Sequence, residues 1–145
     1  MARTHGGVPA VEIVLQNRPE ERSRLLKALE TFADEHQFSA KVRHAADLAL
    51  EEHLTNVLKY AYADTALHEI RVRLSCDNRA LHVEVEDDGR AFNPLELPPV
   101  DTSIPLEERP IGGLGIQLMR QFMDALDYRR EAGRNILRMT KRLES

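Results

Sequence analysis

Residues 48–61 constrain the fold most, because their apolar positions repeat with the period of a helix. The repeating positions are Leu50, Leu54, Val57, Leu58 and Ala61. Steps of three and four residues bury one face of a helix and leave the other face polar. We therefore predict a helix that begins after Ser39, a suitable N-cap residue, and runs to about Tyr62.

The period then changes to that of a strand. Apolar and polar residues alternate over 70–75 and 81–86 around a turn at 77–79, which predicts a hairpin with one solvated face. We expect further strands at 11–15, 126–130 and 135–140, and further helices after Pro19 and Gly115. This order predicts an α+β fold, a two-layer α/β sandwich with a mostly antiparallel mixed sheet and helices on one face. The other face is then either solvated or a dimer surface.

Composition narrows the class of protein. The chain has 145 residues, of which 42% are hydrophobic and 30% charged, as expected for a soluble domain with a real core. Its net charge of -4 argues against general binding to nucleic acid or an anionic membrane. A single cysteine and the lack of a signal peptide or apolar span make the cytoplasm the expected compartment.

The expected organisation is a flexible lead over residues 1–9 and a single domain over residues 10–145. Residues 90–110 show no periodicity and carry Pro94, Pro98, Pro99, Pro105 and Pro110. A loop of this length inside a compact domain is usually a lid, a binding loop or disordered. We expect a mobile lid at about residues 90–111.

Three motifs in a fixed order indicate a nucleotide site. Glu52 and Asn56 stack a carboxylate and an amide one turn apart on the predicted helix. Asp87 and Gly89 follow a strand, where a carboxylate can accept a hydrogen bond from an exocyclic amine. Residues 112–115 open a helix, whose free N–H groups bind anions. Taken alone, Glu52 and Asn56 also fit a pair of solvated side chains, Asp87 and Gly89 also fit a plain turn, and residues 112–115 also fit a hinge. The order and context of the three motifs make them specific together.

The motif segments resemble the GHKL ATPase superfamily, which includes type II topoisomerases, MutL repair proteins and histidine-kinase catalytic domains. The closest likeness is to the small anti-sigma-factor serine/threonine kinases of the RsbW and SpoIIAB type, over about residues 10–142. The segments that carry it are residues 51–56, 86–94, 112–119, 122–124 and 139–141. The resemblance implies the histidine-kinase-like (Bergerat) ATP-binding fold.

The resemblance also implies roles on the helix. Asn56 would bind the Mg²⁺ ion that bridges the phosphates of ATP, and Glu52 would be the base for an attacking hydroxyl. Glu51 is the rival base, but it lies about 100° round the helix from Glu52. The chain departs from the family pattern at Ala91, where relatives have a second glycine, and at Tyr60, where they often have histidine.

For the other two motifs, the resemblance implies contacts to the two ends of ATP. Asp87 would accept the adenine amino hydrogen, and Gly89 would make room for the ring. The phosphates would be bound through Gly113, Leu114 and Gly115.

The implied function is that of an ATP-dependent serine/threonine kinase that acts as an anti-sigma factor. It would bind a sigma factor as a homodimer and phosphorylate a STAS-type antagonist on serine or threonine. One alternative is an ATP- or ADP-sensing binding module without kinase activity. Another is a histidine-kinase catalytic domain, but about ten residues before the first strand leave no room for its dimerisation segment. The histidines lack metal-ligand spacing, so we assign no zinc site.

Overall fold

The computed structural model describes residues 3–5, 8–96, 103, 105 and 113–143. In chain order the elements are β1 (Arg3–His5), β2 (Val8–Gln16), the 3₁₀ helix η1 (Pro19–Glu21), α1 (Arg22–Glu35), α2 (Ala40–Tyr60), β3 (Glu69–Cys76), β4 (Ala80–Asp87), the 3₁₀ helix η2 (Pro94–Glu96), α3 (Gly113–Phe122), β5 (Ala125–Glu131) and β6 (Arg134–Arg142).

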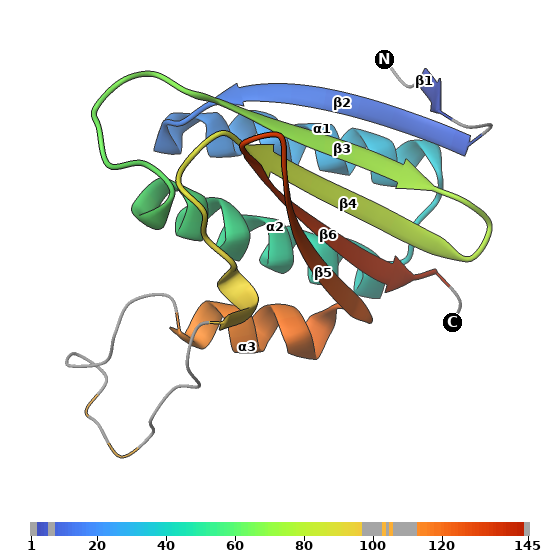
Figure 1. Ribbon diagram of the computed structural model, residues 1–145. Helices are drawn as coiled ribbons and strands as arrows, with labels where there is room; N and C mark the ends of the chain where they lie inside the picture. The colour runs from blue at the N-terminus through green and yellow to red at the C-terminus, as the bar shows by residue number, and fades with distance from the viewer. Residues whose placement is uncertain (1–2, 6–7, 97–102, 104, 106–112, 144–145) are drawn as a thin grey trace.

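The described strands form one six-stranded sheet in the order β1-β2-β3-β4-β6-β5. All the pairings within it are antiparallel. Helices α1, α2 and α3 lie together on one face of this sheet (Figure 1). The predicted α+β sandwich with helices on one face is confirmed, but the described sheet is antiparallel throughout and not mixed. Among the described residues, no helix is both long and apolar enough to cross a membrane.

The central helix forms where the apolar period predicts it. The Ser39 hydroxyl accepts a hydrogen bond from the Val42 N–H at 3.2 Å, which caps the start of α2. The helix ends at Tyr60, two residues before the expected end. Leu50, Leu54 and Val57 are buried against the sheet and neighbouring helices, as the period requires.

The sheet buries one face and exposes the other. Val72 and Leu74 of β3 pair with Val85 and Val83 of β4, and these four side chains are buried in the core. On the opposite face one row of paired positions alternates in charge across the strands: Glu12, Arg73, Glu84, Arg138 and Asp127. Opposite charges in directly facing positions stabilise a sheet in water. The open face is therefore charged and suited to solvent.

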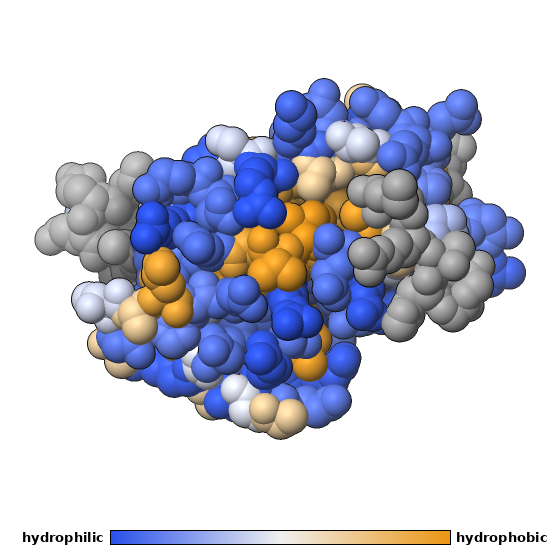
Figure 2. Space-filling view, turned by 90° about the horizontal axis from the view of Figure 1, so that it is seen from above, coloured by the Kyte–Doolittle hydropathy of each residue, from blue (hydrophilic) through white to orange (hydrophobic). Residues whose placement is uncertain are grey.

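The outer edge of β2 is partly covered. Figure 2 looks onto the side of β2 and α1, where an apolar patch is surrounded by hydrophilic side chains. Val14 of β2 is 36% exposed. Its carbonyl accepts a hydrogen bond from Arg24, and the Gln16 N–H donates one to Glu21. These side chains satisfy backbone groups that an edge strand otherwise leaves free.

Part of the lead expected for residues 1–9 lies in the sheet, and its flexibility stays a prediction. Arg3–His5 forms β1, which pairs with the start of β2 through Arg3↔Ala10 and His5↔Val8. The free edge of β2 supplies hydrogen-bonding partners to a short segment that has no apolar period of its own. Of the expected lid, residues 97–102, 104 and 106–112 lie outside the described residues, so its mobility stays a prediction.

Candidate functional site

The three sequence motifs lie at one end of the molecule. Figure 1 shows the end of β4, the end of α2 and the start of α3 on the same side. The Arg90 N–H donates to the Ala61 carbonyl at 2.8 Å, and the Arg90 Nε donates to the Tyr60 carbonyl at 2.6 Å. These bonds fasten the segment that follows Asp87 to the last turn of α2.

Asp87 is a buried carboxylate at the end of β4. It is 2% exposed, and its Oδ1 accepts hydrogen bonds from the Gly89 N–H and from Asn135 Nδ2, both at 2.9 Å. Burial raises the pKa of Asp87, against the lowering effect of the two hydrogen bonds. Within the described residues both hydrogen bonds reach Oδ1, so Oδ2 can accept one from a ligand.

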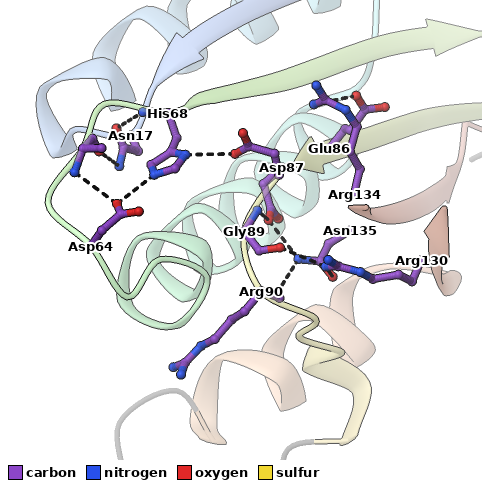
Figure 3. A network of polar contacts seen from close by, with 12 residues as sticks. Asn17, Asp64, His68, Glu86, Asp87, Gly89, Arg90, Arg130, Arg134 and Asn135 are labelled. Carbon is purple, nitrogen blue, oxygen red and sulfur yellow. Dashed lines mark hydrogen bonds and ion pairs between the residues drawn. The ribbon is translucent and has the colours of Figure 1, made fainter. Parts of the chain in front are cut away.

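Asn135 on β6 organises the loop that follows Asp87, and the sequence analysis missed it (Figure 3). Its Nδ2 also donates to the Arg90 carbonyl at 2.8 Å. Its Oδ1 accepts from the Phe92 N–H at 3.1 Å, from Tyr128 Oη at 2.5 Å and from Arg130 Nη1 at 3.0 Å. The sequence offered only one sign of this role, a single amide residue at the start of an apolar strand. An asparagine at that place is explained equally well as part of the preceding turn.

Gly89 has a packing role in addition to the role expected of it. A Cβ at this position would lie 2.3 Å from the Ala61 carbonyl oxygen and 2.7 Å from the Ala61 Cβ. The backbone of Gly89 therefore rests directly against the end of α2, and its φ is not positive. The glycine is required for this contact whether or not a ring binds nearby. Arg130 Nη1 donates to the Gly89 carbonyl at 2.9 Å and holds it from the other side.

Asn56 and Glu52 differ in their surroundings although they stand one turn apart on α2. Asn56 is 1% exposed, and its Nδ2 has no hydrogen-bond partner in the part of the chain that the structure describes. An unsatisfied buried polar group costs about 1–3 kcal/mol, and a ligand oxygen that accepts a hydrogen bond from this Nδ2 would remove that cost. An amide oxygen is a suitable ligand for Mg²⁺. The residues present therefore fit a metal-bound nucleotide beside this helix.

The two candidate bases are distinguished by their partners. Glu51 forms an ion pair with Arg22 of α1, with 2.6 Å between Oε1 and Nη2. Glu52 is half-buried and makes no such ion pair among the described residues. Of the two carboxylates, Glu52 is therefore the one without an ion-pair partner in the described part of the chain.

The start of α3 supplies the third motif. Gly113, Leu114 and Gly115 form the first turn of this ten-residue helix. Backbone N–H groups in a first turn have no partner within the helix, and they bind anions well. The preceding Gly112 lies outside the described residues.

A second polar group flanks Asp87 and was also missed (Figure 3). His68 Nε2 lies 2.8 Å from Asp64 Oδ1, and Nδ1 lies 3.2 Å from Asp88 Oδ1. The hydrogen bond with Asp64 raises the pKa of His68 and lowers the pKa of Asp64. The His68 ring stacks on Tyr62 with 4.3 Å between centroids. Burial, followed by the nearby Asp87 charge, raises the pKa of Tyr62.

A family model described as the histidine kinase-like ATPase domain matches residues 15–141 of the chain. The chain belongs to this family. The prediction of a histidine-kinase-like ATPase domain from the motif segments is thereby confirmed, and the buried Asp87, the unpaired Asn56 and the first turn of α3 lie in a domain of this family.

Two relatives of the ATPase domain carry kinase names. The serine/threonine-protein kinase BtrW of Bordetella bronchiseptica is 33% identical over 114 residues, which cover 77% of this chain and 79% of that protein. The serine-protein kinase RsbW of Bacillus thuringiensis is 30% identical over 101 residues, which cover 67% of this chain and 62% of that protein. The recognition of RsbW-type relatives is confirmed.

A solved structure supports the same fold. The structure of the RsbU and RsbW domains of Rv1364c from Mycobacterium tuberculosis matches this ATPase domain with a TM-score of 0.64 at 15% identity. The match covers 93% of this chain and 32% of that chain. At this identity the likeness shows the fold alone.

Proposed function

We propose that this ATPase domain is an ATP-dependent protein serine/threonine kinase of the RsbW type. The observation that carries the proposal is the buried carboxamide of Asn56, whose Nδ2 has no partner among the described residues, one helical turn from the carboxylate of Glu52. A metal-holding amide beside a proton acceptor suits phosphoryl transfer, which depends mainly on positioning and electrostatics. Relatives with kinase names at 33% and 30% identity support the same activity.

The nucleotide would be held at both ends. The free Oδ2 of Asp87 would accept a hydrogen bond from the adenine amino group, while Asn135 and Gly89 hold the other carboxylate oxygen. The first-turn N–H groups of Gly113, Leu114 and Gly115 would bind the phosphates. Asn56 would hold Mg²⁺, which supplies positive charge to offset that of the phosphates.

The reaction would transfer the γ-phosphoryl group from ATP to a serine or threonine hydroxyl of a protein. The hydroxyl oxygen forms the new P–O bond, the bond between the γ-phosphorus and the bridging oxygen breaks, and ADP leaves. Glu52 takes the hydroxyl proton. In support of this role, Glu52 is half-buried on α2 and has no ion-pair partner among the described residues to neutralise its charge.

The proposed partners follow from the RsbW-type relatives. The substrate would be a STAS-type antagonist, and the second partner a sigma factor bound by a homodimer in the cytoplasm. The apolar patch on the side of β2 and α1 offers surface for such contacts (Figure 2), whereas the charged open face of the sheet does not favour an apolar partner.

The first experiment is titration calorimetry of ATP with Mg²⁺ on the wild type, Asn56→Ala and Asp87→Asn. We expect binding by the wild type and at least tenfold weaker binding by both variants. Absence of binding by folded wild-type protein would remove the nucleotide site and the kinase proposal with it.

The second experiment measures phosphorylation of an antagonist by Glu52→Gln and by its neighbour Glu51→Gln. We expect Glu52→Gln to lose at least about 100-fold in rate, since general base catalysis contributes about 10²–10⁴-fold. Glu51→Gln is the matched control, and it should keep most of the rate because Glu51 pairs with Arg22. If wild-type protein binds ATP but phosphorylates nothing, the alternative of a nucleotide-sensing switch is correct.

A further inference from the structure

His53 has a buried ring nitrogen with no hydrogen-bond partner. The residue lies on α2, is 3% exposed, and its Nδ1 is unpaired among the described residues. Asn56, whose Nδ2 is also unpaired, follows three residues later. Residues three apart in a helix are neighbours on one face. Two residues with an unsatisfied buried polar atom are thus three positions apart on α2, and one of them carries the proposed metal-binding amide.

Packing alone does not explain a histidine at this position. The neighbouring turns of the same face contribute Ala49 and Val57, which are buried apolar residues. An apolar side chain of similar size would fill the space of the imidazole and remove the cost of an unpaired nitrogen. A second unsatisfied amide one turn away doubles that cost. A polar ligand that reaches both side chains would satisfy the pair; the other buried side-chain atoms without a partner among the described residues are His36 Nε2 and Tyr62 Oη.

The imidazole is suited to hydrogen bonding and not to ion pairing. Burial lowers the pKa of His53 to about 4, so the ring is neutral near pH 7. A neutral imidazole offers one N–H donor and one acceptor nitrogen. It can therefore bind a polar atom of a ligand without adding a charge to the site.

We propose that His53 contacts the bound nucleotide directly, through a hydrogen bond from its Nδ1 position to a polar atom of the nucleotide beside Asn56. This inference rests on the proposed nucleotide site and adds a binding residue to it. It assigns a ligand contact to His53, which directly follows Glu52 in the chain and to which the sequence motifs gave no role. His53 binds the nucleotide and takes no proton from the substrate.

Nuclear magnetic resonance tests the contact without any activity. The protein is labelled with ¹⁵N-histidine, and the ring nitrogens of His53 are assigned from their loss in His53→Asn. We expect ADP with Mg²⁺ to shift the Nδ1 resonance of His53. The control is His36, whose buried Nε2 is also unpaired but whose ring packs against Phe32 and Phe38 beyond the end of α1. Its resonances should stay in place.

Two variants separate a ligand contact from a packing role. Asn places a polar atom near the Nδ1 position, and Leu fills the space without one. We expect His53→Leu to weaken ADP binding about three- to tenfold and His53→Asn to stay within about twofold of the wild type. Without ligand, His53→Leu should also melt at the same temperature as the wild type or at a higher one, because the unpaired nitrogen is gone. The rise in melting temperature on addition of ADP should be smaller in His53→Leu than in the wild type.

The outcomes are distinct. If the wild type binds ADP while the Nδ1 resonance does not move and His53→Leu binds equally well, the His53 contact is wrong and the nucleotide site stands. A shift at Nδ1 with unchanged affinity in His53→Leu would indicate an ordered water in place of a direct contact, and would also overturn the inference. If the wild type binds no nucleotide, the proposed function and the inference both fail.

Discussion

Replacement of Asn135 by alanine tests whether this residue holds the site together. The side chain makes two hydrogen bonds through Nδ2, to Asp87 and Arg90, and accepts three through Oδ1, from Phe92, Tyr128 and Arg130. A hydrogen bond contributes about 0.5–1.5 kcal/mol net, and more when one group is charged. In the variant, water can replace the lost hydrogen bond of those partners that are exposed. Only some of the five bonds therefore contribute their full value to the loss in the free energy of unfolding. We expect a loss of about 2–4 kcal/mol in the free energy of unfolding.

Urea unfolding at pH 7, followed by circular dichroism, measures this loss as a lower midpoint with an unchanged slope. The matched control is Asn93→Ala in the same loop, since Asn93 Oδ1 accepts only the Leu95 N–H, at 3.0 Å, among the described residues. It should cost about 0.5–1.5 kcal/mol. Asn135→Ala should also weaken ATP binding, because Asp87 loses the donor that orients its carboxylate. Equal destabilisation by the two substitutions would refute the assignment of Asn135 as the residue that organises the loop.

Three further predictions concern the surroundings of Asp87. Gly89→Ala should destabilise the protein by about 1–3 kcal/mol or more even without nucleotide, because the new Cβ meets the Ala61 backbone; an unchanged urea midpoint would contradict this packing role. Asp87→Asn should abolish ATP binding but leave the ligand-free protein equally or more stable at pH 7. The raised pKa of Asp87 means that folding disfavours its charged form, which therefore costs stability above that pKa. A large loss of stability in thermal unfolding would show that the carboxylate is structural. The raised pKa of His68 means that its protonated form stabilises the fold. This contribution is full below the unfolded pKa near 6.5 and is lost as pH rises through the folded pKa. His68→Gln should therefore flatten the pH dependence of the urea midpoint above about pH 6.5, and an identical pH profile in the variant would count against it.

The secondary structure followed from short-range patterns. The period of residues 50–61 indicated the buried face of α2, and Ser39 caps this helix as expected. The alternation over residues 70–86 indicated the β3–β4 hairpin, whose register buries every second side chain. Such patterns are readable because the helix and strand periods are properties of neighbouring residues. β1 was missed because its pairing depends on the free edge of β2, which no local pattern records.

The motifs named the residues of the candidate site, but only the tertiary structure decided how these residues are held. Asn135 meets Asp87 across 48 positions of the chain because the two residues are partners in the register of β4 and β6. Glu51 and Glu52 look alike in the sequence, and the packing of α1 against α2 gives one of them a partner in Arg22.

The sequence by itself determined which residues form α2, the central hairpin and the nucleotide motifs, because local periodicity and spacing encode them. The tertiary structure decided that Gly89 must lack a side chain, and that Asn56 Nδ2 and His53 Nδ1 have no hydrogen-bond partner among the described residues. The physical reason is that close contacts and missing hydrogen-bond partners depend on the distance between elements far apart in the chain, which the order of residues alone does not specify.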